Sequence, residues 1–298
     1  MTEAPRNVAL DPPPPADSAT PSRRLPLVPF VLLFATVLVP TLFWYSNSFA
    51  RRLDDDQLRL YLRPQASATE TQHALNEITR RLDEKKAPLA EEFYGLVAAL
   101  ERAAGPDGAE KRKGAAWAMQ FDPRSETFRA ALLKLANDPE PLVAWNAATS
   151  LARHGSAAAR PALLAMLAPF EVKATAAGTF RADARLEETL GVGSGGRLGR
   201  IDGPRGPVDL PAPVPGRVTK LFKNGETVAV GDTVALLAPS QSAGMNALAA
   251  LALPGVGRPE DAAAVDAFAK ATPDLQPQVA AQIEATKAAL RGERPASR

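Results

Sequence analysis

Apolar residues recur every three or four positions through residues 54–167, a period that predicts a series of amphipathic α-helices. Glycine and proline end the clearest runs, at Gly105-Pro106 and at Asp138-Pro139. The inward positions of these runs are Phe93, Leu96, Val97 and Leu100, then Phe128, Ala131, Leu132 and Leu135. Ser67 and Glu70 have the spacing of a capping box, in which a hydroxyl and a carboxylate satisfy free N–H groups at a helix start. Residues 52–168 are therefore predicted to be helical.

The predicted helices are internally repeated. A shift of about 31 residues superposes Ala116 on Ala147 and Leu132 on Leu163. The best copy spans residues 137–167 and resembles a HEAT-type repeat at Asp138-Pro139, Leu142-Val143, Ala147-Ala148, Leu151, Gly155, Pro161, Leu163, Leu164 and Leu167. The resemblance implies helix pairs that bury their apolar faces by stacking into a solenoid. Such repeats carry an arginine after Val143, and Ala144 stands there, which weakens the polar contacts expected between neighbouring repeats.

A different pattern occupies residues 212–237, where short apolar runs alternate with turn dipeptides. Asn224-Gly225 is a strong turn signal because both residues tolerate positive φ, and Gly231-Asp232 turns the chain again. The predicted strands cover residues 218–222, 227–230 and 233–237. Strands this short and this closely spaced predict a small barrel or sandwich.

The spacing in this stretch resembles one half of a biotinyl/lipoyl-type barrel-sandwich domain. The matching patterns are A-P-x-x-G-x-V from Ala212, N-G-x-x-V from Asn224 and G-D-x-V-A-L-L from Gly231. Such halves build the carrier domains of carboxylases and dehydrogenases, and also the periplasmic adaptor proteins of hemolysin-type secretion and drug-efflux pumps. The resemblance implies a β module over residues 171–239 with structural turns at Gly216, Gly225 and Gly231.

The other half of such a domain is not evident, since none follows Leu237. The runs Arg200-Ile201 and Val208-Asp-Leu210 are the candidates for it. The glycines of the stretch Gly191-Val-Gly193-Ser-Gly195-Gly196 have dinucleotide-binding spacing, but that function needs a helix to follow, and glycine-, arginine- and proline-rich sequence follows instead.

Carrier function in this family depends on a modified lysine inside Met-Lys-Met or Asp-Lys-Ala. Lys220 and Lys223 are the lysines of the module's best-matching stretch, and neither lies in such a motif. We therefore expect no cofactor, and the resemblance to adaptors is favoured over the resemblance to carriers.

Residues 25–45 contain no charged side chain, and a bilayer core of about 30 Å needs about 20 such residues in a helix. Arg23 and Arg24 flank one end, and Trp44 and Tyr45 stand at the other as interface anchors. The sequence predicts a transmembrane helix over residues 25–46. A cleaved signal peptide ending at Ser48-Phe49-Ala50 is the alternative.

Arginines flank both sides of this segment, so the positive-inside rule does not choose an orientation. We expect the tail of residues 1–24, which is rich in proline and predicted to be disordered, to stay in the cytoplasm. The remainder of the chain would then lie in the periplasm of a bacterium, anchored in the inner membrane.

Residues 241–291 return to a helical pattern, so the β module is predicted to lie between helical segments. Met245, Leu248 and Leu251 share one face of a first helix, and Val265 and Phe268 face inward from a second. Asp274 is predicted to cap a helix over residues 275–290, and residues 292–298 to form a second disordered tail.

Composition removes several classes of function. The 298 residues carry a net charge of +2 and no cysteine, so zinc-thiolate sites and disulfides are excluded and no charge pattern indicates nucleic acid. His73 and His154 are the only histidines, and His154 is expected to have a structural role beside Gly155. The acidic run of residues 54–56 is expected to start a helix rather than to bind a metal.

These patterns predict a mainly α fold: a transmembrane helix, a HEAT-like solenoid, an embedded barrel-sandwich-like β domain and C-terminal helices. The function predicted from them is a non-enzymatic, membrane-anchored adaptor or scaffold. Its partners would be other membrane or envelope proteins and the lipid bilayer, without nucleic acid. The alternatives are an accessory or carrier subunit with a modified lysine, or a purely structural subunit of a membrane complex.

Overall fold

The structure, a computed structural model, describes residues 36, 38, 52–84, 89–184, 186 and 191–293. The chain divides into two units, Met1–Arg51 and Arg52–Arg298. Apart from Thr36 and Leu38, the predicted tail of residues 1–24 and the predicted membrane helix of residues 25–46 lie outside the described residues. Arg23, Arg24, Trp44 and Tyr45 lie outside them as well. Within the described ranges, no helix is both long enough and apolar enough to cross a bilayer.

Helices make up most of the second unit. Those before the β module are α2 (Asp55–Tyr61), α3 (Ala68–Asp83), α4 (Glu91–Ala99), α5 (Gly108–Ala118), α6 (Glu126–Leu135), α7 (Pro141–Arg153) and α8 (Arg160–Leu167). Those after it are α9 (Gln241–Leu251), α10 (Ala262–Ala271) and α11 (Pro277–Leu290). Short 3₁₀ turns extend several of them: η1 (Leu100–Arg102), η2 (Met119–Phe121), η3 (Ala157–Ala159) and η4 (Pro259–Asp261).

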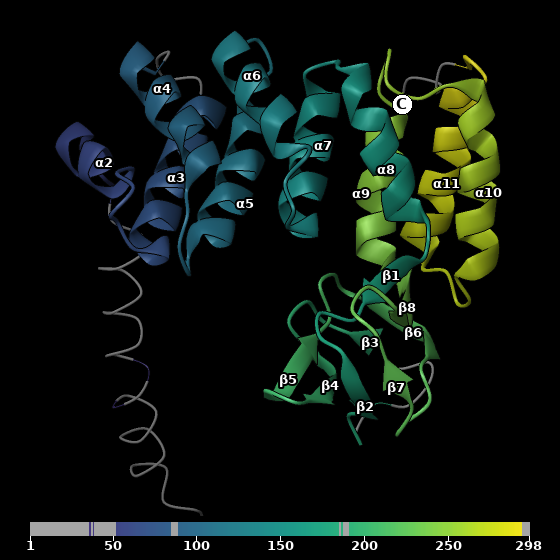
Figure 1. Cartoon of the computed structure of the whole chain (residues 1–298). Coiled ribbons are helices and arrows are strands. Elements are labelled where there is room, and N and C mark those ends of the chain that lie inside the picture. Colours follow the sequence, from purple (N-terminus) through teal and green to yellow (C-terminus); the bar gives the residue numbers. More distant parts are fainter. Residues whose placement is uncertain are drawn as a thin grey trace, which may run out of the picture. The chain divides into compact units, whose positions relative to one another are not determined.

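The helices stack in two layers, which Figure 1 shows in sequence colours. In one layer α3, α5, α7, α9 and α11 follow one another, each in contact with the next. In the other layer α4 contacts α6, and α8 contacts α10. The prediction of a mainly helical fold with stacked helix pairs is confirmed.

Helix α7 shows why these sequences stack. Pro141 stands in its first turn, where a missing N–H costs nothing, and Val143, Ala147 and Leu151 are completely buried as their periodicity predicts. The resemblance to a HEAT-type repeat implies that Leu142 belongs to the inner face as well, but Leu142 is only half-buried. The buried apolar face of α7 is therefore narrower than the sequence pattern indicates.

Polar side chains also join α7 to the preceding repeat. Ser150 Oγ donates a hydrogen bond to Ala116 O at 2.7 Å, and one turn earlier Asn146 Nδ2 donates to Lys113 O at 3.2 Å. Both acceptors are carbonyls inside α5, which use a second lone pair for these contacts. The two helices are thus held in one register along their length.

Arg112 makes a further contact between the repeats. Its Nε donates to Asp138 Oδ2 at 2.6 Å and its Nη2 donates to Asp138 Oδ1 at 3.0 Å, a bidentate pair in which both side chains are largely buried. The repeats are therefore joined by an arginine even though Ala144 occupies the position after Val143.

The β module consists of two antiparallel four-stranded sheets. One has the order β1-β8-β6-β3, from β1 (Phe170–Lys173), β8 (Thr233–Pro239), β6 (Gly216–Leu221) and β3 (Gly191–Val192). The other has the order β5-β4-β2-β7, from β5 (Gly206–Pro211), β4 (Arg197–Gly203), β2 (Gly178–Ala182) and β7 (Thr227–Val228). Each sheet keeps two edge strands, so the described strands do not close into a barrel.

Arg200-Ile201 and Val208-Asp-Leu210, the candidates for a second half, lie on β4 and β5 and pair with each other. The glycine-rich stretch of residues 191–196 forms β3 and the turn into β4, so a strand and not a helix follows it. The chain from Phe170 to Pro239 thus builds the whole module from its own consecutive strands.

Three glycines of the module were predicted to occupy turns. Gly225 and Gly231 each lie in a turn with φ of 90°, a conformation that disfavours other residues. Gly216 instead lies within β6 and is buried, which corrects the predicted turn there. A Cβ at Gly216 would lie 2.5 Å from Ala238 O, so this glycine allows the close approach of β8.

The module is inserted between two helices that contact each other, α8 and α9. Phe170 at its start pairs with Leu237 near its end, so the chain leaves and re-enters the helical stack at neighbouring points. Ser240 follows β8 directly and caps α9 through a hydrogen bond from Ala243 N to Ser240 Oγ. The solenoid therefore continues across the insertion.

Two details of the C-terminal helices differ from expectation. Helix α11 begins at Pro277 after Gln276, and Asp274 lies upstream with a φ of 55° instead of capping it. Met245 is 36% exposed, whereas Leu248 and Leu251 of the same helix are buried. Met245 therefore points away from the core that the other two residues join.

Candidate functional site

A groove of about 390 Å³ crosses the helical layer from α5 to α9. Its lining residues are Trp117, Gln120, Asn146, Thr149, Arg153, Asn246, Ala249, Ala250 and Leu253. On each helix they are spaced by three or four residues, so each helix presents one face to the groove. Helices α5 and α7 precede the β module in the chain, and α9 follows it. The groove therefore forms only because the helical stack continues past the inserted module.

Trp117 is the large apolar surface of the groove. Its side chain lies at the end of α5, and the residue is 39% exposed. The indole packs edge-to-face on Phe121, with ring centroids 5.1 Å apart and an interplanar angle of 72°. An exposed indole held by a neighbouring ring is a preformed contact surface, and tryptophan is enriched among residues that dominate binding energy.

Amide side chains line the floor beside Trp117. Asn146 is oriented by its bond to Lys113 O, and Gln120 Nε2 donates to Trp117 O at 2.9 Å. Each amide therefore uses one donor internally. Within the described part of the chain, their Oδ1 and Oε1 atoms accept no hydrogen bond, which leaves both free to accept N–H groups from a partner.

Arg153 supplies the charge of the groove. It lies in the last turn of α7, is exposed, and makes no ion pair or hydrogen bond within the described residues. The groove's lining includes no acidic residue. The site consequently combines one cation, two oriented amides and one indole.

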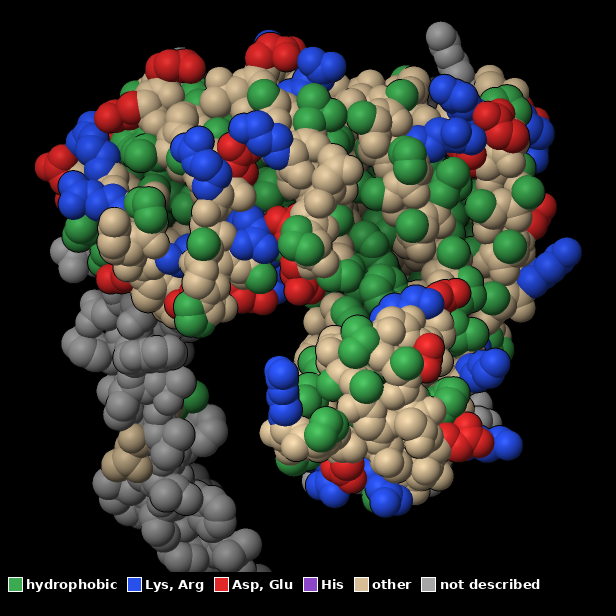
Figure 2. Space-filling model, in the orientation of Figure 1, with side chains coloured by type: hydrophobic (Ala, Val, Ile, Leu, Met, Phe, Trp, Pro, Cys, Tyr) green, Lys and Arg blue, Asp and Glu red, His purple; other side chains and the backbone are tan. Residues whose placement is uncertain are grey.

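Charged side chains are unevenly distributed over the face of the molecule that Figure 2 shows. In Figure 2 charged side chains gather over α2 to α6 and at the far end of the β module, whereas hydrophobic side chains predominate over α8 and α9 beside the module. The surface beside the α9 end of the groove therefore suits contact with another protein better than contact with a polyanion.

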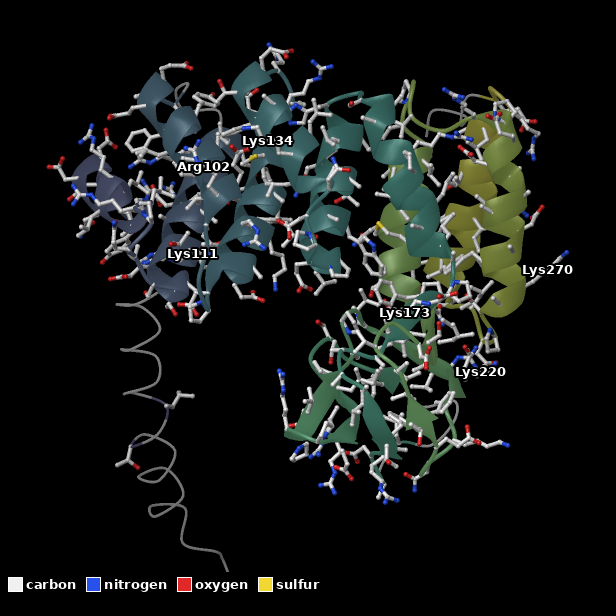
Figure 3. All side chains as sticks on the ribbon, in the orientation of Figure 1. Arg102, Lys111, Lys134, Lys173, Lys220 and Lys270 are labelled. Atoms are coloured by element: carbon white, nitrogen blue, oxygen red, sulfur yellow. The ribbon has the colours of Figure 1, made fainter. Side chains whose placement is uncertain are left out.

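A second hollow, of about 530 Å³, lies on the β module. Its apolar lining residues are Leu221, Phe222, Val234, Ala235 and Leu236, and its charged lining residues are Glu171, Lys220, Lys223 and Glu226. Figure 3 shows Lys173 and Lys220 on this module. The ammonium group of Lys173 lies 2.5 Å from Glu171, and this hydrogen bond holds the pKa of the Glu171 carboxyl below its usual range.

The two lysines that were candidates for carrier function differ in their position relative to a turn. Lys223 precedes the Asn224-Gly225 turn between β6 and β7, and its side chain is 85% exposed, 3.8 Å from Glu226. Lys220 is exposed on β6 itself. The structure thus places Lys223, but not Lys220, next to a turn.

Neither histidine belongs to a cluster of metal-binding side chains among the described residues. His154 is the C-cap of α7, and its Nε2 lies 3.0 Å from Met119 O. His73 lies on α3, with its ring 6.4 Å from Tyr61. In the described ranges, no three residues among His, Cys, Asp and Glu are placed to hold a metal ion.

Sequence patterns did not indicate the groove. Neither Trp117 nor Arg153 lies on a predicted apolar face or in a motif. A weak signal exists in α7, whose outward positions Asn146, Thr149 and Arg153 repeat at helical spacing. Nothing local indicates that Asn246 lies beside them, because the β module separates them in the chain.

Comparison with protein families finds a match to HEAT repeats over residues 95–180. The matched segment runs from α4 through α8 into the first strands of the β module. It supports the HEAT-like part of the sequence prediction and gives no evidence for a biotinyl/lipoyl-type module. Searches of curated proteins and of solved structures find no match.

Proposed function

We propose that the protein is a non-enzymatic adaptor or scaffold that binds a protein partner in the groove between α5, α7 and α9. The observation that carries this proposal is the groove's lining, in which exposed Trp117 lies with the unpaired cation of Arg153 and with oriented amides. Stacked helix pairs favour this role because they present an extended surface made of successive repeats.

The β module would add a second contact surface. Its exposed valines, Val208 on β5 and Val230 in the turn after β7, are 39% and 67% exposed. The lipoyl-like glycine pattern supports a comparison with the β modules of periplasmic adaptors. Membrane anchoring through residues 25–46 belongs to the same proposal and rests on their sequence, as do partners in the membrane or envelope and a periplasmic location.

Photo-crosslinking from inside the groove tests this function. The full chain would carry p-benzoylphenylalanine at Asn146 in cells that produce it, with the same group at Arg129 of α6 as the control, whose side chain is 44% exposed. We expect a discrete crosslinked protein from position 146 that is lost when Trp117→Ala is added. Absence of an adduct, or the same adduct from both positions, would contradict the proposal.

A carrier or accessory subunit is the second candidate. It is favoured by one observation, the exposed Lys223 beside the Asn224-Gly225 turn. Intact mass of the purified chain separates the two functions, because lipoate or biotin adds a fixed mass to the lysine. We expect the unmodified mass, and a modified Lys223 whose replacement by arginine abolishes function would favour the carrier.

A further inference from the structure

We infer that the groove between α5, α7 and α9 takes an extended peptide segment with a carboxylate next to an apolar side chain. Arg153 would bind the carboxylate, and Trp117 would pack against the apolar side chain. The inference rests on the proposed function and names the chemistry of its partner.

The charge distribution supports an acidic partner. The 13 residues of α7 include a single charged side chain, that of Arg153, and the 11 residues of α9 include none. On α5, Lys113 pairs with Glu110 at 2.5 Å and brings no net charge to the groove. The positive charge of Arg153 is therefore uncompensated by neighbours on the helices that build the site.

The geometry of a guanidinium suits an anion that offers two oxygens, such as a carboxylate or a phosphate. Arginine presents two parallel N–H donors, which match the two oxygens of a carboxylate. A nucleic acid would require a row of cations to neutralise successive phosphates, and this groove offers one. A single carboxylate on a peptide fits this one cation, and it is the anion that the inference names.

The side-chain amides that line the groove indicate that the bound peptide has an extended backbone. Such a backbone offers unpaired N–H and C=O groups at every residue, and side-chain amides carry both complementary groups. Gln120 and Asn146 come from successive helices of the layer, and Asn246 comes from the next. A peptide crossing the helices would meet these amides in turn.

The size of the groove agrees with a short segment. A volume of 390 Å³ is at the lower end of the range for sites that take small molecules, roughly 300–1,000 Å³. Trp117 provides an apolar contact at the α5 side of the groove, and Leu253 lies at the α9 side. The groove therefore holds a few side chains of a peptide.

Arg153 also lies where a cation stabilises a helix C-terminus. That role and the proposed one differ in what they predict. Replacing Arg153 by glutamine would change helix stability slightly in either case, but a change in the peptide's charge would alter binding only if Arg153 contacts the carboxylate.

The test is a display selection on the full purified chain. Two libraries of random peptides of about ten residues are compared, identical except that one fixes a glutamate and the other fixes a glutamine at the same position. We expect peptides from the glutamate library to be enriched, with aliphatic or aromatic residues close to the glutamate. Equal enrichment from both libraries would overturn the inference.

A double-mutant cycle then tests the contact itself. For a selected peptide, we expect Arg153→Gln and the change of the peptide's glutamate to glutamine each to weaken binding about tenfold, with no further loss when both are combined. Arg102→Gln is the matched control, since Arg102 is exposed and forms no ion pair within the described residues. It should leave binding unchanged.

If Arg153→Gln binds the acidic peptide as well as the parent chain does, the inference is wrong. Should binding then still depend on Trp117, the proposed protein-binding function would survive with a different partner chemistry. Photo-crosslinking at Asn146 decides that function independently of any peptide.

Discussion

Asp261→Asn should destabilise the helical stack, because Asp261 follows the inserted β module in the chain and contacts α8, which precedes the module. Its carboxylate lies at the end of η4, 1% exposed, and accepts hydrogen bonds from Arg160 of α8. Arg160 Nε lies 2.9 Å from Oδ2 and 3.0 Å from Oδ1, and Nη2 lies 2.5 Å from Oδ1. The backbone N–H of Arg258 also donates to Oδ2 at 2.9 Å. One carboxylate thus ties residues on both sides of the insertion.

The asparagine keeps the shape of the side chain but replaces one acceptor oxygen with a donor. The new amide NH₂ group would then face N–H groups of Arg160 or Arg258, which now donate hydrogen bonds to the Asp261 carboxylate. The ion pair between Asp261 and Arg160 would also be lost. A hydrogen bond to a charged group contributes about 1.5–3 kcal/mol, and breaking a fully buried ion pair costs about 3–5 kcal/mol. Because Arg160 is 22% exposed and can rehydrate, we expect a loss of about 2–3 kcal/mol in the free energy of unfolding.

Urea and thermal unfolding of the full chain, followed by circular dichroism at a helical wavelength, measure this loss. For a unit of this size, about 2–3 kcal/mol corresponds to a fall in Tm of roughly 4–12 °C. Glu260→Gln is the control, since Glu260 is 60% exposed and its contact with Arg160 is at 3.2 Å. It should leave Tm unchanged. An Asp261→Asn variant as stable as the parent would refute the argument.

The pH dependence follows from the same contacts. Burial favours the neutral form of Asp261, but the hydrogen bonds from Arg160 and Arg258 outweigh it and hold the pKa of this carboxyl below its usual range. Its contribution is therefore complete above the unfolded-state value, about 3.9, and is lost as pH falls through the lowered folded-state pKa. The stability difference between parent and Asp261→Asn should shrink in that acidic window.

Three further predictions concern the other parts of the fold. Leu132→Asp should lower Tm strongly, because it buries a carboxylate on the inner face of α6, while Leu133→Asp at the 38% exposed neighbour should not; similar Tm values would show that the inner face is misassigned. Gly225→Val should lower the free energy of unfolding of the β module by about 1–3 kcal/mol, because valine disfavours the φ of 90° at this position. Hydrogen exchange should show the β module unfolding before the helices, and an equal loss of protection in both parts would contradict the claim that their cores are separate. Replacing residues 170–239 by a short glycine-serine linker should preserve the helical circular dichroism per helical residue, because Phe170 and Leu237 pair as neighbours about 5 Å apart; loss of that signal would mean that the stack depends on the module.

Sequence patterns located those elements whose cause is local. The capping box at Ser67 and Glu70 is present, with Glu70 N donating to Ser67 Oγ at 3.2 Å and Ser67 N donating to Glu70 Oε2 at 2.8 Å. The buried face of α6 was likewise predicted from its period, and Phe128 and Leu132 are completely buried. These features depend on residues three or four positions apart, which a linear sequence displays.

Glycine illustrates where local pattern fails. Gly216 and Gly225 both lie in the β-rich stretch of residues 212–237, and the sequence predicts a turn at each. Gly225 meets that expectation because its φ is positive. Gly216 instead allows the close approach of β8, where a Cβ would meet the carbonyl oxygen of Ala238, a residue 22 positions later in the chain. A single sequence does not distinguish these two uses of glycine.

The candidate groove was not predictable for a similar reason. Its walls come from α5, α7 and α9, and the β module lies between the last two in the chain. The Arg160 to Asp261 contact, 101 residues apart, is equally absent from any local pattern. The β module carries a sequence pattern that resembles a known family, whereas the helical surface becomes a site only when the repeats are stacked.

The most direct test of the central claim is hydrogen–deuterium exchange on the full chain, with and without the partner identified by photo-crosslinking at Asn146. The account predicts added protection in peptides covering α5 with η2, the last turns of α7, and α9, and no change in α6, which lies in the other layer. Protection confined to α6, or to the β module with the three groove helices unchanged, would contradict the claim that this groove holds the partner.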